Sequence, residues 1–332
     1  MKKNVSIKKV TAVLLACIMA VSLIACGKAQ KADSEVITHI AGLKGPTSMG
    51  MVKLMDDAAN NQSKGKYDFT LAGSADEVTP KLISGEIDIA ALPANLASVL
   101  YNNTQGEIEL LAVNTLGVLY IVDKGDSIHS VSDLKGKTIV GSGKGSTPEF
   151  SLRYILAENG IDPDKDVNIE WKSEHTEVVQ TLAADATGQT VGLLPQPFVT
   201  VASTQVEGLH IAIDLTKEWD ALDNGSKLIT GVMAVRKKFA SEHPDALKTF
   251  LEEYEASVDY VNANVGEAAN LIEKFDIIKA AVAKNALPYC NIVCISGDEM
   301  KASVKGYLEI LFEAEPKSVG GKMPGEDFYL DF

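Results

Sequence analysis

Short apolar runs alternate with segments of helical periodicity along the part of the chain that follows residue 35. Between residues 49 and 60, Val52, Met55 and Ala59 recur at the spacing of one helix face. The predicted elements here are a strand at 36–41, a helix at 49–60, a strand at 67–71, a helix at 76–84 and a strand at 87–90. This alternation of strands and helices predicts an α/β fold.

The same order of elements occurs a second time, with identical residues at matching positions 100 residues later. The matched pairs are Thr38/Thr138, Lys44/Lys144, Gly45/Gly145, Thr47/Thr147, Glu77/Glu177, Val78/Val178 and Leu82/Leu182. After the third strand of each copy, Leu92-Pro93 corresponds to Leu194-Pro195. Self-similarity at a fixed offset sets the architecture. It predicts two α/β units with the same role.

Two apolar segments connect the predicted units. The run 110–122, interrupted by Asn114, Thr115 and Gly117, is predicted to be one strand that crosses from the first unit to the second, and 228–235 carries the chain back. Two crossings form a hinge, which is how closing clefts are built. We therefore predict two Rossmann-like α/β domains joined by a two-segment hinge, with domain 1 at 36–116 and 231–332 and domain 2 at 117–230.

The N-terminal region has the charge order of a secretory signal. Four lysines precede sixteen mostly apolar residues, 10–25, and Cys26 follows. Sixteen residues are short for a membrane-spanning helix, which needs about 20. The tetrapeptide Leu23-Ile24-Ala25-Cys26 resembles the lipobox of bacterial lipoproteins, whose cysteine is acylated. We therefore predict a signal peptide at 1–25, acylation (as by palmitate) at Cys26 and a flexible tether at 26–35, which together hold the protein at the extracytoplasmic face of the membrane.

Length and charge limit the possible partners. The 332 residues suffice for about two domains, and 46% hydrophobic with 23% charged residues is ordinary for a folded soluble protein. The formal net charge is −14, and loss of residues 1–25 would leave 27 basic against 45 acidic groups, a net charge of −18. Such a surface repels nucleic acid, so no nucleic-acid partner is predicted.

The C-terminal cysteines leave two alternatives open. Cys290 and Cys294 could form a disulfide only if the chain turns around Asn291; otherwise they are two buried thiols. Two cysteines without a nearby histidine do not make a zinc site. No Ser, His and Asp stand in a catalytic order with supporting spacing, so neither catalytic residues nor a metal or other cofactor are predicted.

A glycine-rich loop before a helix is the strongest candidate for ligand chemistry. Residues 141–148 lead into a predicted helix at 149–159, a geometry in which free backbone N–H groups attract anions. The pattern lacks the Gly-Lys-Ser/Thr of a P-loop, and a tight turn without a ligand is the alternative. Recurrence of Lys-Gly-x-Thr at 44–47 favours a binding role.

Amide side chains follow the third strand of each copy, where open α/β sheets bind ligands. They are Asn95, for which a helix N-cap is an equal alternative, and Gln196. The predicted ligand-binding residues are Lys44, Gly45, Pro46, Thr47, Ser48, Asn95, Lys144, Gly145, Ser146, Thr147 and Gln196.

Four segments together carry a family resemblance. They are the lipobox at Cys26, Gly-Glu-Ile-Asp-Ile-Ala at 85–90, Val-Ser-Asp-Leu-Lys-Gly-Lys at 131–137 and Glu-His-Pro-Asp-Ala-Leu at 242–247. With the repeat, they resemble bacterial ABC-transporter substrate-binding lipoproteins, in particular the group of nitrate, taurine, alkanesulfonate and thiamine-pyrimidine binders.

The resemblance implies a clamp of the type II periplasmic-binding-protein kind that carries a small-molecule ligand between its domains to a membrane permease. We expect a monomer without enzymatic activity. An enzyme on the same fold, related to pyrimidine synthesis, and a sensory module that presents its ligand to a receptor remain as alternatives.

Overall fold

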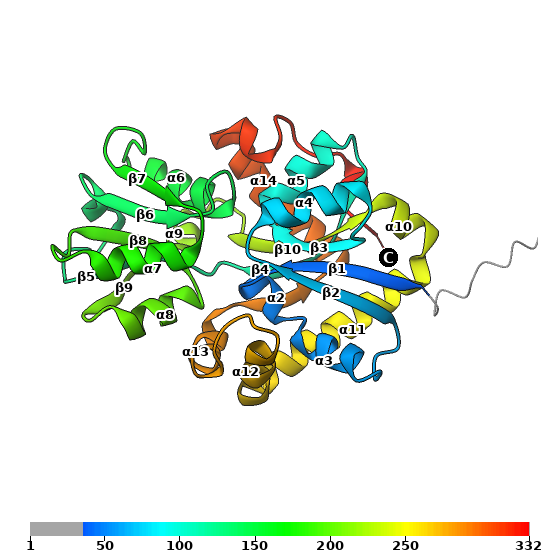
Figure 1. Ribbon diagram of the computed structural model, residues 1–332. Helices are drawn as coiled ribbons and strands as arrows, with labels where there is room; N and C mark the ends of the chain where they lie inside the picture. The colour runs from blue at the N-terminus through cyan, green and yellow to red at the C-terminus, as the bar shows by residue number, and fades with distance from the viewer. Residues whose placement is uncertain (1–35, 332) are drawn as a thin grey trace, which may run out of the picture.

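The computed structural model describes residues 36–331, which form two β-sheets flanked by helices (Figure 1). The six-stranded sheet, in spatial order, contains β11 (Ile292–Ile295), β4 (Ile108–Leu116), β10 (Ile229–Arg236), β3 (Ile89–Pro93), β1 (Ile37–Leu43) and β2 (Lys66–Ala72). The five-stranded sheet contains β7 (Asn168–Lys172), β6 (Thr138–Ser142), β8 (Thr190–Pro195), β5 (Leu119–Lys124) and β9 (Leu209–Asp214). The predicted α/β class is confirmed.

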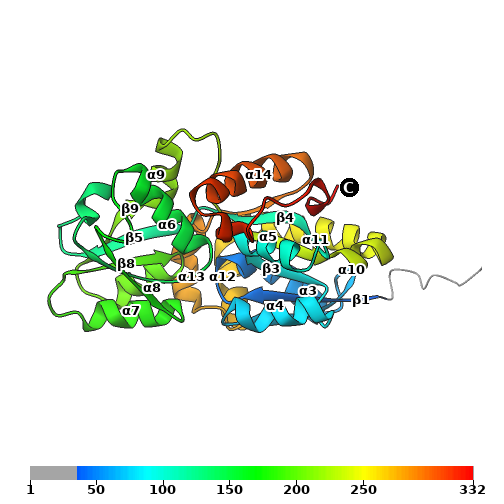
Figure 2. The same ribbon diagram turned by 90° about the horizontal axis from the view of Figure 1, so that it is seen from above.

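The helices cover both faces of the six-stranded sheet (Figures 1 and 2). The helices before β10 are α2 (Pro46–Met49), α3 (Val52–Ala59), α4 (Ala75–Ser84), α5 (Ala94–Asn103), α6 (Thr147–Glu158), α7 (His175–Ala184), α8 (Phe198–Gln205) and α9 (Leu215–Ala221). Those after it are α10 (Lys237–Glu242), α11 (Pro244–Ala263), α12 (Val265–Lys274), α13 (Ala280–Ala286) and α14 (Gly297–Ala314). Short 3₁₀ helices are η2 (Val131–Leu134), η3 (Leu287–Tyr289), η4 (Pro316–Val319) and η5 (Glu326–Phe328).

The two sheets share one strand arrangement. In the first, β1 pairs in parallel with β2 and β3, and β10 runs antiparallel beside β3. In the second, β6 pairs in parallel with β7 and β8, and β5 runs antiparallel beside β8. Helices α4 and α7 start and end at positions 100 residues apart. The order of elements read from the repeat is therefore present in both copies.

Several identities of the repeat have a structural cause. The Glu77 carboxylate accepts hydrogen bonds from the backbone N–H groups of Gly73 and Ser74, both at 3.1 Å, and so caps α4. Glu177 accepts the N–H of Ser173 at 3.0 Å ahead of α7. The valine and leucine pairs that follow are buried against the sheets. These identities therefore have a role in the fold.

The prediction of a single crossing strand at 110–122 is wrong. Strand β4 ends at Leu116 and belongs to the six-stranded sheet, whereas β5 begins at Leu119 in the five-stranded sheet. Gly117 lies at the break, and a Cβ atom there would come within 2.1 Å of Thr216 Oγ1. Close approach of α9 therefore requires glycine at this point.

The predicted helix at 49–60 is also divided, into α2 and α3, while its partner in the second copy, α6, is one helix of 12 residues. A core shared by both sheets lies under α14, where Tyr307 packs between them. Its ring centroid is 5.4 Å from that of Trp219, which is 4.9 Å from that of Tyr154. Such aromatic contacts add to the burial of apolar area.

Cys290 and Cys294 are free thiols and form no disulfide with each other. Cys290 is buried after η3 and its Sγ donates to the Ala286 carbonyl oxygen at 3.3 Å, while Cys294 lies in the extended strand β11. The chain does turn at Asn291, which has a left-handed φ of 43°, yet both thiols are free, so the disulfide alternative does not hold. Burial raises the pKa of both thiols to about 12.

No helix within residues 36–331 has the length and apolar character to cross a bilayer. The predicted signal peptide at 1–25, the predicted acylation at Cys26 and the whole predicted tether at 26–35 lie outside the described residues.

Candidate functional site

The first-copy loop places two unpaired hydroxyls in the interior. Thr47 and Ser48 lie in α2, directly after β1, with exposed fractions of 7% and 0%. Within residues 36–331, Thr47 Oγ1 and Ser48 Oγ have no hydrogen-bond partner. A buried hydroxyl left unpaired costs about 1–3 kcal/mol, so natural proteins usually pair it with protein, water or ligand.

Residues of β4 extend this set. The Asn114 side-chain N–H donates to the Thr47 carbonyl oxygen at 3.3 Å, which fixes the orientation of the amide. Asn114 Oδ1 and Thr115 Oγ1 are also buried without partners among the described residues. We call Thr47, Ser48, Asn114 and Thr115 the unpaired cluster.

Gly231 of β10 permits the close packing of Thr47, Asn114 and Thr115, whereas Ser48 Oγ lies against Gly42 of β1. A Cβ atom at Gly231 would lie 2.4 Å from Asn114 Oδ1 and 2.5 Å from Thr47 Cγ2. Gly231 is also in register with Thr115 on one side and with Pro93, at the end of β3, on the other. The cluster therefore sits where both connecting strands leave the six-stranded sheet. The sequence prediction missed Asn114 and Thr115 as site residues, although polar side chains inside an apolar run were the available signal.

In the second-copy loop, polar groups are hydrogen-bonded to the loop itself and to the helix that follows it. The Gly145 N–H donates to Glu149 Oε2 at 2.6 Å, and the Ser146 hydroxyl donates to the Gly143 carbonyl oxygen at 2.7 Å. Glu149, whose side chain is 8% exposed, also accepts a hydrogen bond from Arg153 Nε at 3.1 Å. The Glu149 carboxylate thus complements the positive N-terminal end of the α6 helix dipole. The first copy has Met49 at the matching position, so it lacks such an internal anion.

The lysines of the two loops are not brought into the unpaired cluster. Lys44 Nζ forms an ion pair with Asp276 at 2.7 Å near the surface, and Lys144 is exposed. The two arginines are engaged elsewhere, since Arg153 bonds Glu149 and Arg236 pairs with Asp88 at 2.5 Å. The polar atoms of the cluster are therefore neutral hydroxyls and an amide.

Asn95 and Gln196 have different roles. Asn95 is not an N-cap, because α5 begins after Pro93 without a side-chain cap. Its Nδ2 donates to the Ser318 carbonyl oxygen at 2.9 Å and to the Gly145 carbonyl oxygen at 3.4 Å, which joins the two loops. Gln196 Oε1 accepts the Thr200 hydroxyl at 2.9 Å and so closes the first turn of α8.

A partly buried histidine lies at the corresponding end of the second sheet. His175, the first residue of α7, is hydrogen-bonded through Nδ1 to the Ser142 hydroxyl, and its ring is 4.7 Å from that of Phe198. Burial lowers the pKa of His175 from 6.5 to about 4. The imidazole is therefore neutral at physiological pH and contributes hydrogen bonding without charge.

Two open hollows lie away from these residues. One, of about 640 Å³, is lined by Lys172 at the end of β7 and by residues of α7 that include Glu177. The other, of about 390 Å³, lies between α12 and α13. Neither is lined by a predicted ligand residue. Among residues 36–331 there is no group of three or more His, Cys, Asp or Glu side chains arranged to hold a metal ion.

Comparison with known proteins decides the family. Residues 60–286 match the family described as ABC transporter, phosphonate, periplasmic substrate-binding protein, which is more than half of the chain. The chain belongs to this family. Proteins of the family are transporter substrate-binding proteins and not enzymes, so the non-enzymatic prediction and the predicted resemblance are confirmed.

A binding protein of Brucella abortus (strain 2308) is 25% identical over 210 residues, which are 60% of this chain and 62% of the relative. The chain thus matches less than two thirds of the length of that relative. An ABC transporter crystal structure from Parabacteroides distasonis has a TM-score of 0.73 at 23% identity and covers 90% of this chain and 99% of that one. The periplasmic aliphatic sulphonate binding protein SsuA from Escherichia coli has a TM-score of 0.70 at 15% identity, with 89% and 92% covered. These likenesses confirm the type II periplasmic-binding-protein fold.

Proposed function

We propose that this chain is the extracytoplasmic solute-binding component of an ABC importer. It captures a small organic ligand, anionic or heterocyclic, between its two sheets and delivers that ligand to a membrane permease. The family membership and the two connecting segments support this proposal. In this proposal the two domains are 36–116 with 231–332 and 117–230, and the protein acts as a monomer.

The unpaired cluster is the observation that carries the proposal. Four polar side chains buried at the exit of the connecting strands have unpaired oxygen atoms within residues 36–331. A ligand with several acceptor oxygens, such as a phosphonate or a sulfonate, would pair the three hydroxyls, and a ligand N–H or O–H would pair Asn114 Oδ1. The family description and the sulphonate specificity named for SsuA make these two compound classes the first to test.

The lipid anchor is part of the same proposal. Acylation at Cys26, followed by the polar tether, would keep the protein beside its permease on the outer face of the membrane.

Native mass spectrometry of protein purified from rich medium tests the proposal. We expect a fraction of the protein to carry one small molecule that is released on denaturation and that raises the melting temperature when it is added back. Protein that carries no small molecule, and whose melting temperature no phosphonate, sulfonate or heterocycle raises, would contradict it.

A further inference from the structure

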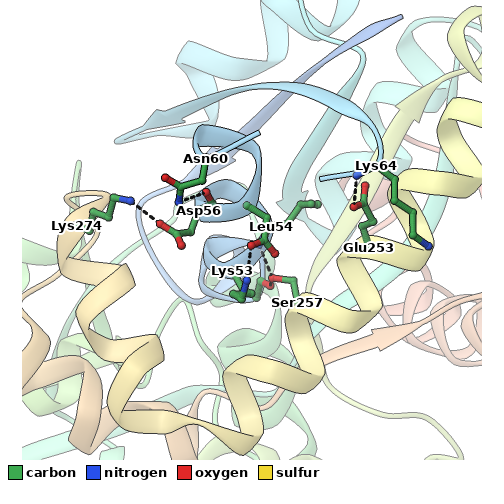
Figure 3. Close-up of polar contacts among 10 residues, drawn as sticks. Lys53, Leu54, Asp56, Asn60, Lys64, Glu253, Ser257 and Lys274 are labelled. Atoms are coloured by element: carbon green, nitrogen blue, oxygen red, sulfur yellow. Dashed lines mark hydrogen bonds and ion pairs between the residues drawn. The ribbon is translucent and has the colours of Figure 1, made fainter. Parts of the chain in front are cut away.

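The break between α2 and α3 is made by a side chain from the far end of the sequence. In a continuous helix the Leu54 N–H would donate to the Gly50 carbonyl oxygen. Instead it donates to Ser257 Oγ at 3.1 Å (Figure 3). The Ser257 hydroxyl in turn donates to the Gly50 carbonyl oxygen at 2.6 Å. The Ser257 hydroxyl of α11 is thus inserted into the backbone hydrogen bond that would join Leu54 and Gly50 in a continuous helix. Such an insertion is a recognised cause of helix breaks.

The surrounding backbone shows that the interruption is local. The Met51 N–H donates to the Ser48 carbonyl oxygen at 3.1 Å, a three-residue step, whereas the Met55 N–H donates to the Met51 carbonyl oxygen at 2.8 Å, the normal four-residue step. Regular helix therefore resumes one residue after the inserted hydroxyl.

Glycine and burial make room for the insertion. Ser257 is 2% exposed. A Cβ atom at Gly50 would lie 3.0 Å from the Tyr254 hydroxyl oxygen and from a methyl carbon of both Val258 and Ile292. Gly50 therefore lets the break lie directly against α11, where Ser257 can reach it.

Other polar contacts hold α3 and the following segment without involving the Leu54 N–H or the Gly50 carbonyl oxygen. Lys274 Nζ of α12 pairs with Asp56 at 2.5 Å, and Glu253 accepts the Lys64 N–H at 2.7 Å (Figure 3). These contacts anchor the same region from the outside. They provide controls for any variant that merely loosens α3.

The break and the unpaired hydroxyls occur together in the first copy only. In the second copy α6 is continuous and Thr147 Oγ1 has a partner, Asn95 Oδ1. In the first copy the break precedes α3, and Thr47 and Ser48 on its N-terminal side keep unpaired hydroxyls. On the N-terminal side of the break, Thr47 is connected to β4 through its carbonyl oxygen, which accepts the Asn114 side-chain N–H at 3.3 Å.

We propose that Ser257 is a positioning residue for the ligand: its hydroxyl holds the α2–α3 break open and thereby keeps Thr47 and Ser48 in the unpaired cluster. This inference rests on the proposed function, in which these hydroxyls contact the ligand. It makes the helix α11, more than 200 residues away in sequence, a determinant of the first-copy site.

The test combines nuclear magnetic resonance with calorimetry on Ser257→Ala, Ser257→Thr and Lys274→Met. The probe is whichever of methylphosphonate, 2-aminoethylphosphonate, ethanesulfonate or inorganic phosphate binds the parent most tightly. Ser257→Ala removes the inserted hydroxyl, so the Leu54 N–H is expected to donate directly to the Gly50 carbonyl oxygen and the Leu54 amide resonance is expected to shift. Probe binding is expected to weaken at least about tenfold, the equivalent of one lost hydrogen bond to a charged group.

The other two variants separate positioning from loosening. Ser257→Thr retains the hydroxyl and is expected to keep the parental shifts and affinity, while Lys274→Met cuts an anchor of α3 and is expected to leave affinity unchanged. Parental affinity in Ser257→Ala, or equal losses in Ser257→Ala and Lys274→Met, would overturn the inference.

Failure of the inference is distinguishable from failure of the proposed function. If Thr47→Val weakens binding but Ser257→Ala does not, the ligand site stands and the positioning role is wrong. If no probe binds the parent, the phosphonate and sulfonate classes are wrong. The positioning role is then decided by the Thr47 and Asn114 resonances, which Ser257→Ala must shift; unchanged resonances would overturn it.

Discussion

The Thr147 hydroxyl donates to Asn95 Oδ1 at 3.4 Å, so the start of α6 in one sheet unit contacts the start of α5 in the other. The same Asn95 amide donates to the carbonyl oxygens of Gly145 and Ser318. One buried side chain thus connects the second-copy loop, α5 and the C-terminal 3₁₀ helix η4. Sequence reasoning predicted Asn95 and Thr147 as ligand contacts, and the structure brings them together at the junction of the units.

Removal of this amide is expected to destabilise the fold. Asn95→Ala would leave the Ser318 carbonyl oxygen and the Thr147 hydroxyl without this partner. The Asn95 and Thr147 side chains are both 0% exposed, so water cannot replace the lost hydrogen bonds. The free energy of unfolding should fall by about 1–3 kcal/mol in urea denaturation. Asn60→Ala is the matched control, because Asn60 makes an exposed bond to the Asp56 carbonyl oxygen, and it should cost less than about 0.5 kcal/mol. Equal losses would contradict the assigned role of Asn95.

The capping glutamates are expected to affect stability and not binding. Glu77→Ala removes the acceptor of two backbone N–H groups and should lower the free energy of unfolding by about 0.5–2 kcal/mol. Glu177→Ala should act in the same direction through Ser173. Calorimetric titration should show parental ligand affinity for both variants. Weakened binding with normal stability would show that these identities of the repeat serve the ligand.

His175 is expected to give the protein an acid-sensitive component of stability. Its pKa is lowered from 6.5 to about 4 by burial, so the unfolded chain binds this proton at a higher pH than the folded chain. The contribution of neutral His175 is fully present above pH ~6.5 and is lost as pH falls toward ~4, a change of about 3 kcal/mol.

His175→Phe should remove this component, so the difference in unfolding free energy between variant and parent should change between pH 7 and pH 4. The control is His129→Gln, at a side chain that is 66% exposed. A constant difference for His175→Phe across this range, matching the control, would refute the lowered pKa of the His175 imidazole.

The anchor prediction concerns Cys26. Cys26→Ser removes the thiol that acylation requires, so metabolic labelling with a radioactive or clickable fatty acid should label the parent and not the variant. The variant should appear as unprocessed precursor or in the medium. Fatty-acid labelling of Cys26→Ser equal to that of the parent would refute the lipoprotein prediction.

Local signals in the sequence predicted the elements well where the cause is local. The strand–helix order and the matched copies follow from hydrophobic periodicity, and the end of α4 follows from Gly85, which adopts φ 85° there. The break between α2 and α3 could not be predicted, because the hydroxyl that makes it belongs to Ser257. The break in the run 110–122 required knowledge that Thr216 packs against Gly117.

The candidate site was predicted in part. Thr47 and Ser48 have the burial and unpaired hydroxyls that a ligand contact requires, whereas Lys44 is paired with Asp276 at the surface. The symmetry of the repeat suggested two equal loops, but Glu149 satisfies the second loop from within. A repeat in sequence therefore fixed equivalent backbone positions without fixing equivalent chemistry. Whether these residues bind the ligand stays a prediction.

Calorimetric titration of Thr47→Val with the ligand that the parent binds is the most direct test of a ligand held by the unpaired cluster. Valine keeps the shape of the side chain and removes a hydroxyl that has no partner within residues 36–331, so the ligand-free protein should unfold as the parent does. The account predicts one binding site in the parent and binding weaker by roughly 10- to 100-fold in the variant, the equivalent of one hydrogen bond to a charged ligand group. Parental affinity in Thr47→Val would contradict it.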